Sequence, residues 1–138
     1  MNKIYHLSTC DTCKKILAQI PNISEFELQD IKSNPVSETQ LQEMFNLTGS
    51  YEQLFSKRAQ LYKQLNLKEA NLLELDFKKY LLEHYTFLAR PIIIYNKIIF
   101  VGNSKKNIDN LLQELKNNEI NFNKEQAKDL LEEFSRKE

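Results

Sequence analysis

The stretch that decides the fold is residues 3–17, which read KIYHLSTCDTCKKIL. Its first part, residues 3–7, alternates partly between apolar and polar side chains and contains strand-favouring residues, so we expect a short first strand. The spacing then changes to that of a helix, with an apolar stripe made by Cys13, Ile16, Leu17 and Ile20. Pro21 ends this helix. Cys13 is therefore expected to face inward, with Cys10 at or just before the helix start.

The segment up to residue 88 predicts one more strand and several helices. The strand is expected at residues 23–28, where Phe26 and Leu28 share a face, and it forms a parallel β-α-β unit with a right-handed crossover. The expected helices are one opened by a capping box of Ser37 and Gln40 and ended by Gly49, one at about 57–65, and one beginning near Asp76 whose buried side includes Phe77, Tyr80, Leu81, His84 and Leu88.

Two strands and two helices are expected after Pro91. Residues 92–95 and 98–101 are mostly apolar and only Asn96-Lys97 separates them, which predicts a hairpin with a two-residue turn. The two helices are expected to begin at Ser104 and Asn123, with apolar stripes made by Ile108, Leu111, Leu112 and Leu115 in the first and Ala127, Leu130, Leu131 and Phe134 in the second.

This order of elements predicts an α/β fold with one mixed four-stranded sheet, in which an antiparallel hairpin and a covering helix complete the β-α-β unit. That is the thioredoxin-like (glutaredoxin-like) arrangement. We expect a single domain over residues 1–138, because no linker rich in Gly, Ser or Pro divides it. The core is expected at about 1–35 and 89–116, with a helical insertion at about 36–88 between the second and third strands and an extra C-terminal helix at about 123–137.

Composition excludes several classes of function. The chain has 138 residues, 41% of them hydrophobic and 28% charged, which is enough apolar surface for a core. Lys and Arg total 19, as do Asp and Glu, so no overall positive field favours direct nucleic-acid or membrane binding. No apolar run approaches the roughly 18 residues of a membrane span, and the first residues lack the apolar core of a signal peptide. We therefore expect a cytoplasmic protein.

Chemistry is expected at Cys10 and Cys13, the only two cysteines of the sequence. A helix N-terminus lowers the pKa of a thiol from about 8.5 to roughly 3.5–7.5, so Cys10 is the candidate nucleophile. Cys13, one turn later, is the candidate resolving thiol. Lys14 adds positive potential nearby. His6, four residues before Cys10, either stabilises the thiolate or merely packs in the strand.

Two other interpretations of the cysteine pair stay open. A C-x-x-C motif can be half of a zinc site, but there is no second cysteine pair, and His6 and His84 lack the usual spacing, so we expect no metal. Alternatively, both thiols are inert members of the core. The change from strand to helix around the motif favours a redox-active pair. His84 lies on an apolar helix stripe and is expected to be a boundary residue.

Two arginines are candidates for binding an anionic substrate, because a guanidinium is planar and permanently charged. Arg90 directly precedes Pro91 at the entry to the third strand, in a loop that faces the cysteine helix in thioredoxin-like sheets. A cis Arg90–Pro91 bond there would place the neighbouring backbone against the substrate. Arg58 lies in a basic stretch, residues 57–63, which is also typical of a solvated helix surface.

Three motifs in this order resemble the arsenate reductase (ArsC)/Spx family, over about residues 3–115. They are Cys10-Asp11-Thr12-Cys13-Lys14-Lys15, the stretch from Ser56-Lys57-Arg58 to Tyr62-Lys63-Gln64-Leu65, and Arg90-Pro91-Ile92-Ile93-Ile94 followed by Phe100-Val101-Gly102. The resemblance implies that Cys10 is the nucleophile, that Arg58 and Arg90 surround it, and that His6 matches a histidine preceding it by four.

The resemblance implies an arsenate reductase-like thiol–disulfide oxidoreductase without a bound cofactor. Its substrate would be a small anion or a disulfide, and glutathione with glutaredoxin, or thioredoxin, would supply the electrons. The alternative is a Spx-like redox-sensing transcriptional regulator that binds the C-terminal domain of the RNA polymerase α subunit.

Some residues favour the Spx side of the family. They are Cys13, Ser56-Lys57-Arg58 and Arg90-Pro91-Ile92-Ile93-Ile94. Two stretches depart from the arsenate reductase pattern. Leu7-Ser8-Thr9 stand where arsenate reductases carry Asn-Pro. Asn103-Ser104-Lys105 stand where a third arginine is expected. Gly49 falls near the glycine that Spx uses for its polymerase contact, although the local pattern alone explains it as a helix end.

Overall fold

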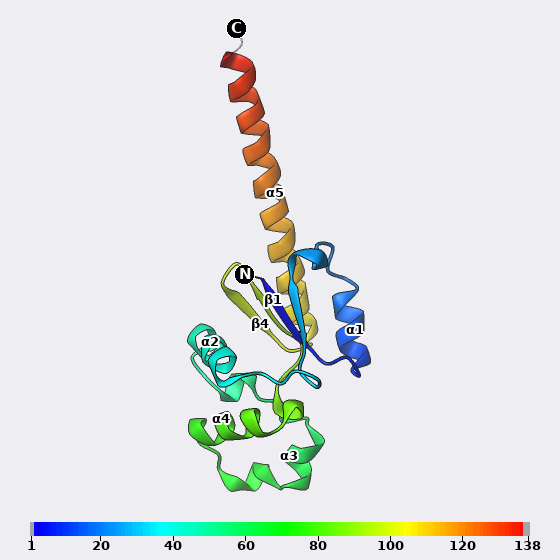
Figure 1. Cartoon of the computed structure of the whole chain (residues 1–138), viewed down its shortest axis with the longest axis vertical. Helices are drawn as coiled ribbons and strands as arrows, with labels where there is room; N and C mark the ends of the chain where they lie inside the picture. Colours follow the sequence, from blue (N-terminus) through cyan, green and yellow to red (C-terminus); the bar gives the residue numbers. More distant parts are fainter. Residues whose placement is uncertain (1, 137–138) are drawn as a thin grey trace. The chain divides into compact units, whose positions relative to one another are not determined.

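A computed structural model describes residues 2–136, without the side chains at 120–123 and 132–136. The chain divides into two compact units, Met1–Ser104 and Lys105–Glu138. The first unit contains the sheet and most of the helices, and the second contains the long helix α5 (Figure 1). The division falls inside the 89–116 segment that the sequence assigns to the core.

The first unit is built on a mixed sheet of four strands in the order β2-β1-β3-β4. The strands are β1 (Lys3–His6), β2 (Glu27–Asp30), β3 (Ile92–Tyr95) and β4 (Ile98–Val101). Strand β1 pairs with β2 in parallel and with β3 in antiparallel register, and β3 pairs with β4 in antiparallel register. The mixed α/β sheet predicted from the sequence is thereby confirmed.

The β3–β4 hairpin turns through two residues, as predicted. Asn96 has φ +48° and Lys97 has φ +65°, the left-handed pair that a type I′ turn requires. Asn tolerates this conformation well, whereas Lys adopts it at a steric cost. The Asn96 backbone N–H also donates to the Asn2 side chain at 3.1 Å, which ties the turn to the start of the chain.

The second strand differs from the expectation of 23–28. Ile23–Glu25 form a 3-10 helix, and β2 begins only at Glu27, whose N–H donates to the Asn2 carbonyl at 2.9 Å. Pairing with β1 therefore sets where this strand begins. Within β2, Leu28 is 48% exposed and the polar Gln29 is buried. The Gln29 amide can be buried because its side chain exchanges hydrogen bonds with that of Gln40.

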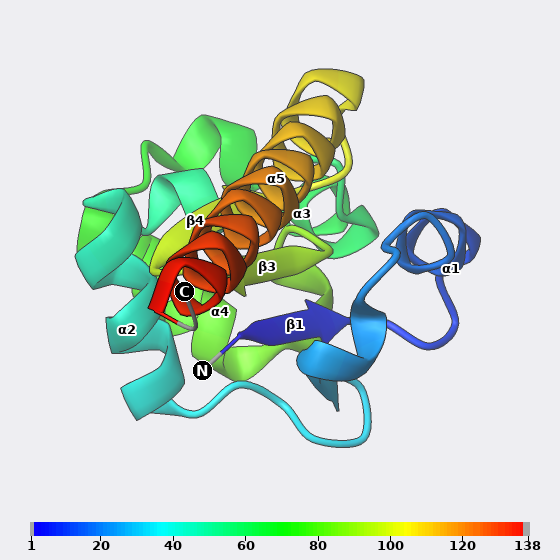
Figure 2. The same cartoon turned by 90° about the horizontal axis from the view of Figure 1, so that it is seen from above.

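Helix α1 (Asp11–Leu17) follows β1 as the spacing predicted, but it ends before Ile20, so the prediction that Pro21 ends it is wrong. Ile20 is still buried, in the turn after the helix. Cys10 is its N-cap residue, in extended conformation, so the prediction that it lies just before the helix is confirmed. Cys13 and Ile16 are buried, with exposures of 0% and 4%. Helices α1 and α2 lie on different sides of β1 (Figure 2).

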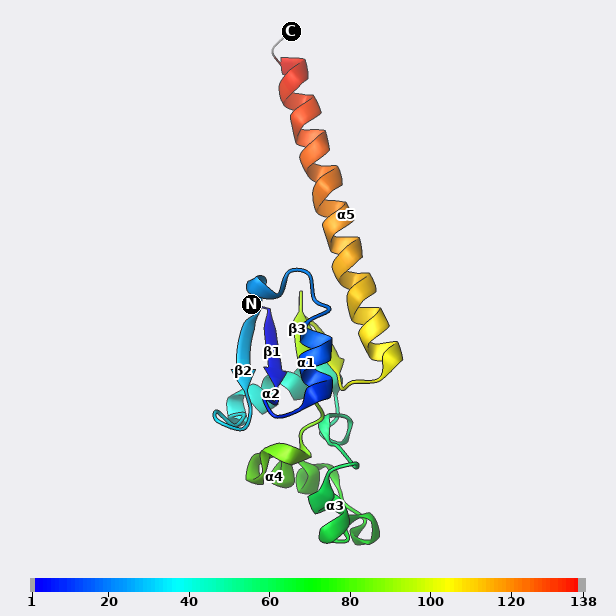
Figure 3. The same cartoon turned by 90° about the vertical axis from the view of Figure 1, so that its right-hand side faces the viewer.

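The segment between β2 and β3 contains the elements α2 (Glu38–Thr48), η2 (Glu52–Leu54), α3 (Gln60–Gln64), η3 (Leu67–Ala70), α4 (Glu74–Glu83) and η4 (Tyr85–Phe87). The predicted capping box of Ser37 and Gln40 is present, and Gly49 ends α2 with φ +76°. Helices α3 and α4 lie together beyond one end of the strands (Figures 1 and 3).

Two helix boundaries in this segment correct the sequence prediction. The helix expected at 57–65 is shortened to α3, because Lys57 and Arg58 lie in a turn before it. Helix α4 ends at Glu83, so His84 and Leu88 are not on its stripe. His84 instead is the N-cap of the 3-10 helix η4, where its side chain accepts a hydrogen bond from the Thr86 backbone N–H two residues later. The polar side chain competes with the helix for backbone groups at this point.

Two connecting segments pair with each other at the sheet end. The Ser56 N–H donates to the Phe87 carbonyl at 2.7 Å, and the Ala89 N–H donates to the Leu54 carbonyl at 2.8 Å. Phe55 lies between them, with its ring 5.0 Å from those of both Phe77 and Phe87. This buried aromatic contact holds together two parts of the chain that each lead to an arginine.

Helix α5 runs without interruption from Lys105 to Arg136. The prediction of a separate last helix beginning at Asn123 is therefore wrong for the backbone up to 136, and residue 137 of the expected range lies outside the described residues. Nothing in residues 116–123 forces a break, because this stretch contains neither Pro nor Gly. In its second half, Leu130 and Leu131 are 66% and 69% exposed.

Candidate functional site

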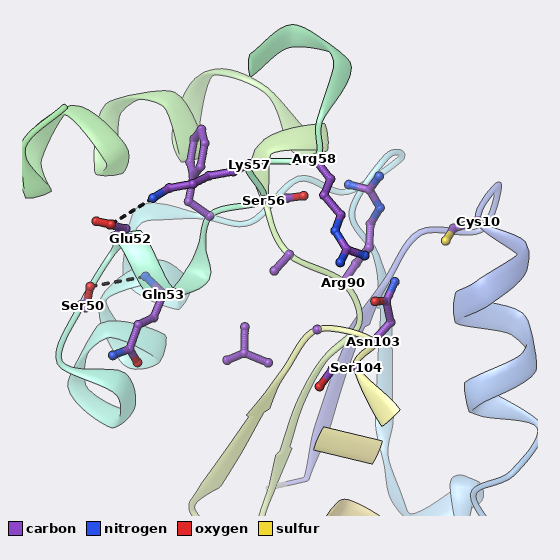
Figure 4. Close-up of a pocket in the computed structure, with 14 residues that line it drawn as sticks. Cys10, Ser50, Glu52, Gln53, Ser56, Lys57, Arg58, Arg90, Asn103 and Ser104 are labelled. Carbon is purple, nitrogen blue, oxygen red and sulfur yellow. Dashed lines mark hydrogen bonds and ion pairs between the residues drawn. The ribbon is translucent and has the colours of Figure 1, made fainter. Parts of the chain in front are cut away.

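A cleft of about 800 Å³ lies in the first unit and is lined by segments far apart in sequence (Figure 4). Cys10 comes from the start of α1, and the other lining residues come from three later segments. These residues are Ser50, Glu52, Gln53, Phe55, Ser56, Lys57 and Arg58, then Ala89 and Arg90, and finally Val101, Gly102, Asn103 and Ser104.

Cys10 is half-buried at this cleft, and its surroundings favour the thiolate. Burial alone would raise the pKa of the Cys10 thiol. Hydrogen bonds from the Cys13 backbone N–H, the Cys13 thiol and the Thr12 backbone N–H outweigh this, and the charge of Arg90 adds to them, so the pKa is lowered. The backbone below is fixed as well, because the Cys10 N–H donates to the Leu7 carbonyl at 3.0 Å.

Cys13 has the opposite environment. It is 0% exposed, and burial raises its pKa to about 11, against the smaller opposing effect of a hydrogen bond from the Leu7 backbone. At neutral pH Cys13 is therefore a thiol that donates a hydrogen bond to Cys10. Both cysteines are free in this structure. Of the two sulfurs, Cys10 is therefore the one that loses its proton more readily.

Arg90 is held in place by the backbone around it. Its Nη1 atom donates to the Thr86 carbonyl at 2.9 Å and to the Leu88 carbonyl at 3.3 Å. The Arg90–Pro91 peptide bond is cis. The Pro91 carbonyl accepts from the Gly102 N–H at 2.9 Å, which joins the arginine loop to the segment after β4.

Arg58 is exposed and lines the same cleft from the turn before α3. The neighbouring residue Lys57 forms an ion pair instead: its Nζ lies 3.1 Å from the Glu52 carboxylate and 5.9 Å from the centroid of the Phe77 ring. The structure thus brings Cys10, Arg58 and Arg90 to one cleft (Figure 4), where two guanidinium groups can bind an anion beside the sulfur.

Three other residues singled out from the sequence do not line the cleft: His6, Lys14 and Pro91. Lys14 is exposed on α1. His6 lies opposite Asp30 on the neighbouring strand, because the two residues are partners in the β1–β2 pairing. Hydrogen bonds from Ser8, its side chain first, lower the pKa of the Asp30 carboxyl, and the charge of His6 contributes to the same lowering. The Ser8 backbone N–H donates to Asp30 Oδ1 at 3.2 Å, which ties the loop that leads to Cys10 to the end of β2.

Several polar residues of the cleft were not predicted as site residues. Asn103 and Ser104 follow Gly102, whose φ of +87° turns the chain after β4. Their position on the sheet edge beside Arg90 was a signal in the sequence, because antiparallel pairing places the end of β4 next to the start of β3. Ser50 and Ser56 left no such signal, since they arrive through tertiary packing of the insertion.

Neither a metal centre nor a membrane span is found in the described part of the chain. Among the side chains that the structure describes, at residues 2–119 and 124–131, no group of three or more His, Cys, Asp or Glu has an arrangement that could hold a metal ion. No helix in the described part of the chain combines the length and apolarity needed to cross a bilayer.

The fold and the cysteine motif define a thioredoxin-like protein with a helical insertion, and comparison with known proteins agrees. A model of the ArsC family matches residues 5–111. The chain therefore belongs to the ArsC family, and the resemblance found in the sequence is confirmed.

Curated relatives and solved structures fall on both sides of this family. Global transcriptional regulator Spx 2 of Bacillus anthracis is 28% identical over 112 residues, covering 79% of this chain and 85% of that protein. Spx of Bacillus subtilis is 26% identical over 114 residues, covering 81% and 87%. An arsenate reductase from Vibrio cholerae superposes with a TM-score of 0.66 at 21% identity, covering 81% and 95% of the two chains. An arsenate reductase related protein from Brucella melitensis superposes with a TM-score of 0.61 at 19% identity, covering 76% and 88%. These structures show the fold.

Proposed function

We propose that the chain is an arsenate reductase-like thiol–disulfide oxidoreductase in which Cys10 is the attacking thiolate and Cys13 the resolving thiol. The observation that carries the proposal is the lowered pKa of Cys10 in a cleft that also holds Arg58 and Arg90. A thiolate beside two guanidinium groups is suited to attack an electrophile that carries negative charge.

With a disulfide substrate, the Cys10 thiolate attacks one sulfur and forms a mixed disulfide, and the other sulfur leaves as a thiolate. Cys13 then loses its proton and attacks the Cys10 sulfur, which releases the second substrate thiolate. The substrate gains two electrons, and the protein is left with a Cys10–Cys13 disulfide.

With arsenate, the Cys10 thiolate attacks arsenic and displaces an oxygen that leaves as water, while Arg58 and Arg90 bind the remaining oxyanion. Attack of Cys13 on the Cys10 sulfur then breaks the S–As bond, and arsenic leaves with the electron pair as arsenite. The same Cys10–Cys13 disulfide results. Alternatively, glutathione with glutaredoxin resolves the adduct.

Each route needs an external thiol to restore the reduced pair, and we assign this to glutathione or thioredoxin. The proposal requires no bound cofactor or metal. It places the protein in the cytoplasm, where thiol reductants keep such a pair reduced between turnovers.

Turnover assays test this assignment. Reduction of arsenate and of a mixed disulfide is measured for the wild type, Cys10→Ser and Cys13→Ser, with glutathione–glutaredoxin and thioredoxin systems as alternative donors. Cys10→Ser should lose activity in every assay, and Cys13→Ser should accumulate a covalent adduct at Cys10, visible by mass spectrometry. Equal activity in all three proteins would reject the proposal.

A second candidate is a Spx-like regulator that binds the RNA polymerase α subunit and uses the cysteine pair as a redox sensor. The observation that favours it is the identity of 28% and 26% to two Spx proteins, each covered over most of its length. Gly49, exposed at the end of α2 with φ +76°, supplies an accessible turn for such a contact.

Pull-down with the isolated C-terminal domain of the α subunit distinguishes the two candidates. Binding that depends on the oxidation state of the pair, with no substrate turnover, supports the regulator. Absence of binding in both the oxidised and the reduced state removes it.

A further inference from the structure

His84 is a half-buried titratable residue that the proposed chemistry does not use. It ends α4 and begins the 3-10 helix η4 in extended conformation, with φ −148° and ψ 129°. Its ring stacks on Tyr85 at 4.8 Å and meets Phe87 edge-on at 6.3 Å. These contacts restrict the ring to one orientation.

In this orientation the ring caps the turn that follows. The Thr86 backbone N–H donates to His84 Nδ1 at 3.2 Å, and the Thr86 hydroxyl oxygen lies 2.7 Å from the same nitrogen. Because Nδ1 accepts the backbone N–H, the ring carries its proton on Nε2. The imidazole therefore fixes the position of the Thr86 peptide unit.

The carbonyl group of Thr86 in turn holds the side chain of Arg90. The Thr86 carbonyl accepts from Arg90 Nη1 at 2.9 Å, the shorter of the two hydrogen bonds that this nitrogen makes. The charge of Arg90 is one of the causes that lower the pKa of Cys10. A chain of direct contacts thus runs from the His84 ring through Thr86 to the cation beside the thiolate.

The two carbonyls that hold Arg90 are secured differently. The Leu88 carbonyl belongs to a segment already paired with residues 54–56, through hydrogen bonds on both sides of it. The Thr86 carbonyl lies outside that pairing, within η4, and depends on the turn that His84 caps. Loss of the cap should therefore release one of the two anchors and leave the other.

We propose that His84 is a positioning residue, which acts through Thr86 to hold the Arg90 guanidinium where it stabilises the Cys10 thiolate. This rests on the proposed function only in taking Cys10 as the attacking thiol. Alkylation of Cys10 reads its ionisation without any substrate, so failure of the reductase assays would leave this test intact.

The test compares His84→Leu, which cannot accept the hydrogen bond, with His84→Asn, whose side-chain oxygen can take the place of Nδ1. Site-resolved alkylation of Cys10 by iodoacetamide near neutral pH and ultraviolet titration of the thiolate are the readouts. His84→Leu should slow alkylation by about twofold to fivefold, the size of effect expected for one partly exposed charge. His84→Asn should restore the wild-type rate. His84→Ala serves as a second deletion variant that adds no volume beside Tyr85, if the leucine variant does not fold.

Arg90→Gln makes the test specific. If His84 acts through Arg90, the His84→Leu substitution should not slow Cys10 alkylation any further in a protein that already carries Arg90→Gln. An unchanged rate of Cys10 alkylation in folded His84→Leu or His84→Ala protein would overturn the proposal. So would an equal slowing with and without Arg90, since that indicates a general loosening of the fold.

Discussion

Cys10 and Cys13 lie three residues apart at the start of one short helix, yet their surroundings move their pKa values in opposite directions. Cys10 is half-buried, and backbone N–H groups, the Cys13 thiol and Arg90 lower its pKa. Cys13 is fully buried, and this raises its pKa to about 11. The difference teaches that a C-x-x-C motif is asymmetric because one sulfur faces hydrogen-bond donors at a cleft while the other faces the core.

The largest expected effect is the contrast in alkylation rate between the two sulfurs. Only the thiolate reacts, and at about pH 8 a thiol with a pKa of about 11 is ionised to roughly one part in a thousand. Iodoacetamide should therefore modify Cys10 at least about 100-fold faster than Cys13, as measured by peptide mass spectrometry. Unfolding in denaturant is the control and should bring the two rates close together. Comparable rates in the folded protein would contradict the asymmetry.

The second prediction separates the two arginines that share the cleft with Cys10. Arg90→Gln should raise the pKa of Cys10, because it removes a charge that lowers it, and slow alkylation by about threefold to tenfold. Arg58→Gln should leave the rate of Cys10 alkylation nearly unchanged. It should weaken the binding of anionic substrates and raise their KM by about tenfold. Thiolate titration and steady-state kinetics of both variants check this. An equal change in the pKa of Cys10 in the two variants would show that Arg58 and Arg90 do not have separate roles.

The third prediction concerns stability in alkaline solution. The pKa of Cys13 is higher in the folded state than in the unfolded chain, so its contribution to stability is complete below the ordinary thiol pKa of about 8.5. That contribution is lost as the pH rises through about 11. Cys13→Ala should cost roughly 1 kcal/mol at neutral pH and flatten the fall in stability above about pH 8.5.

Urea unfolding at several pH values measures this effect. The comparison is clearest below about pH 10, because burial also raises the pKa of Tyr5 to about 12, and loss of that contribution begins near the ordinary tyrosine pKa of about 10. Parallel curves for the wild type and Cys13→Ala would show that Cys13 is not the titrating group.

The smallest expected effects are those of Lys14→Gln and His6→Gln. Neither residue lines the cleft, and neither is among the groups that shift the pKa of Cys10. Each substitution should change Cys10 alkylation by less than about twofold, the range of a screened surface charge. A larger change from Lys14→Gln than from Arg90→Gln would mean that the charge on α1, and not the cleft, activates the thiol.

Local rules were sufficient for much of the fold. The hairpin follows from two apolar runs separated by Asn96-Lys97, and α2 follows from Ser37, Gln40 and Gly49. The rules failed where tertiary contacts decide. Pairing with β1 sets the start of β2, and the hydrogen bonds between Gln29 and Gln40 allow a polar side chain to be buried in that strand. In the long helix, polar residues typical of a break are accommodated because nothing forces the chain to turn.

For the candidate site as well, local sequence patterns identified some residues and missed others. Cys10 and Cys13 could be found because their spacing follows from helix geometry, and Arg90 because it directly precedes the third strand. Arg58 could be identified only through the family resemblance, since a basic stretch on a surface helix carries little information by itself. Asn103 was missed although its position directly after the last strand was a signal, and Ser56 was missed because it reaches the cleft only through tertiary packing of the insertion.

By itself, the order of residues 3–17 determined that a strand leads into a helix with one sulfur at its start and one on its buried side, because strand and helix periods are local properties. Only the tertiary structure decided that the two arginines line the same cleft as that sulfur. The pairing of residues 54–56 with 87–89 brings together segments separated by about thirty residues. Such a contact depends on the shape of the packed aromatic cluster around Phe55, which no local pattern specifies.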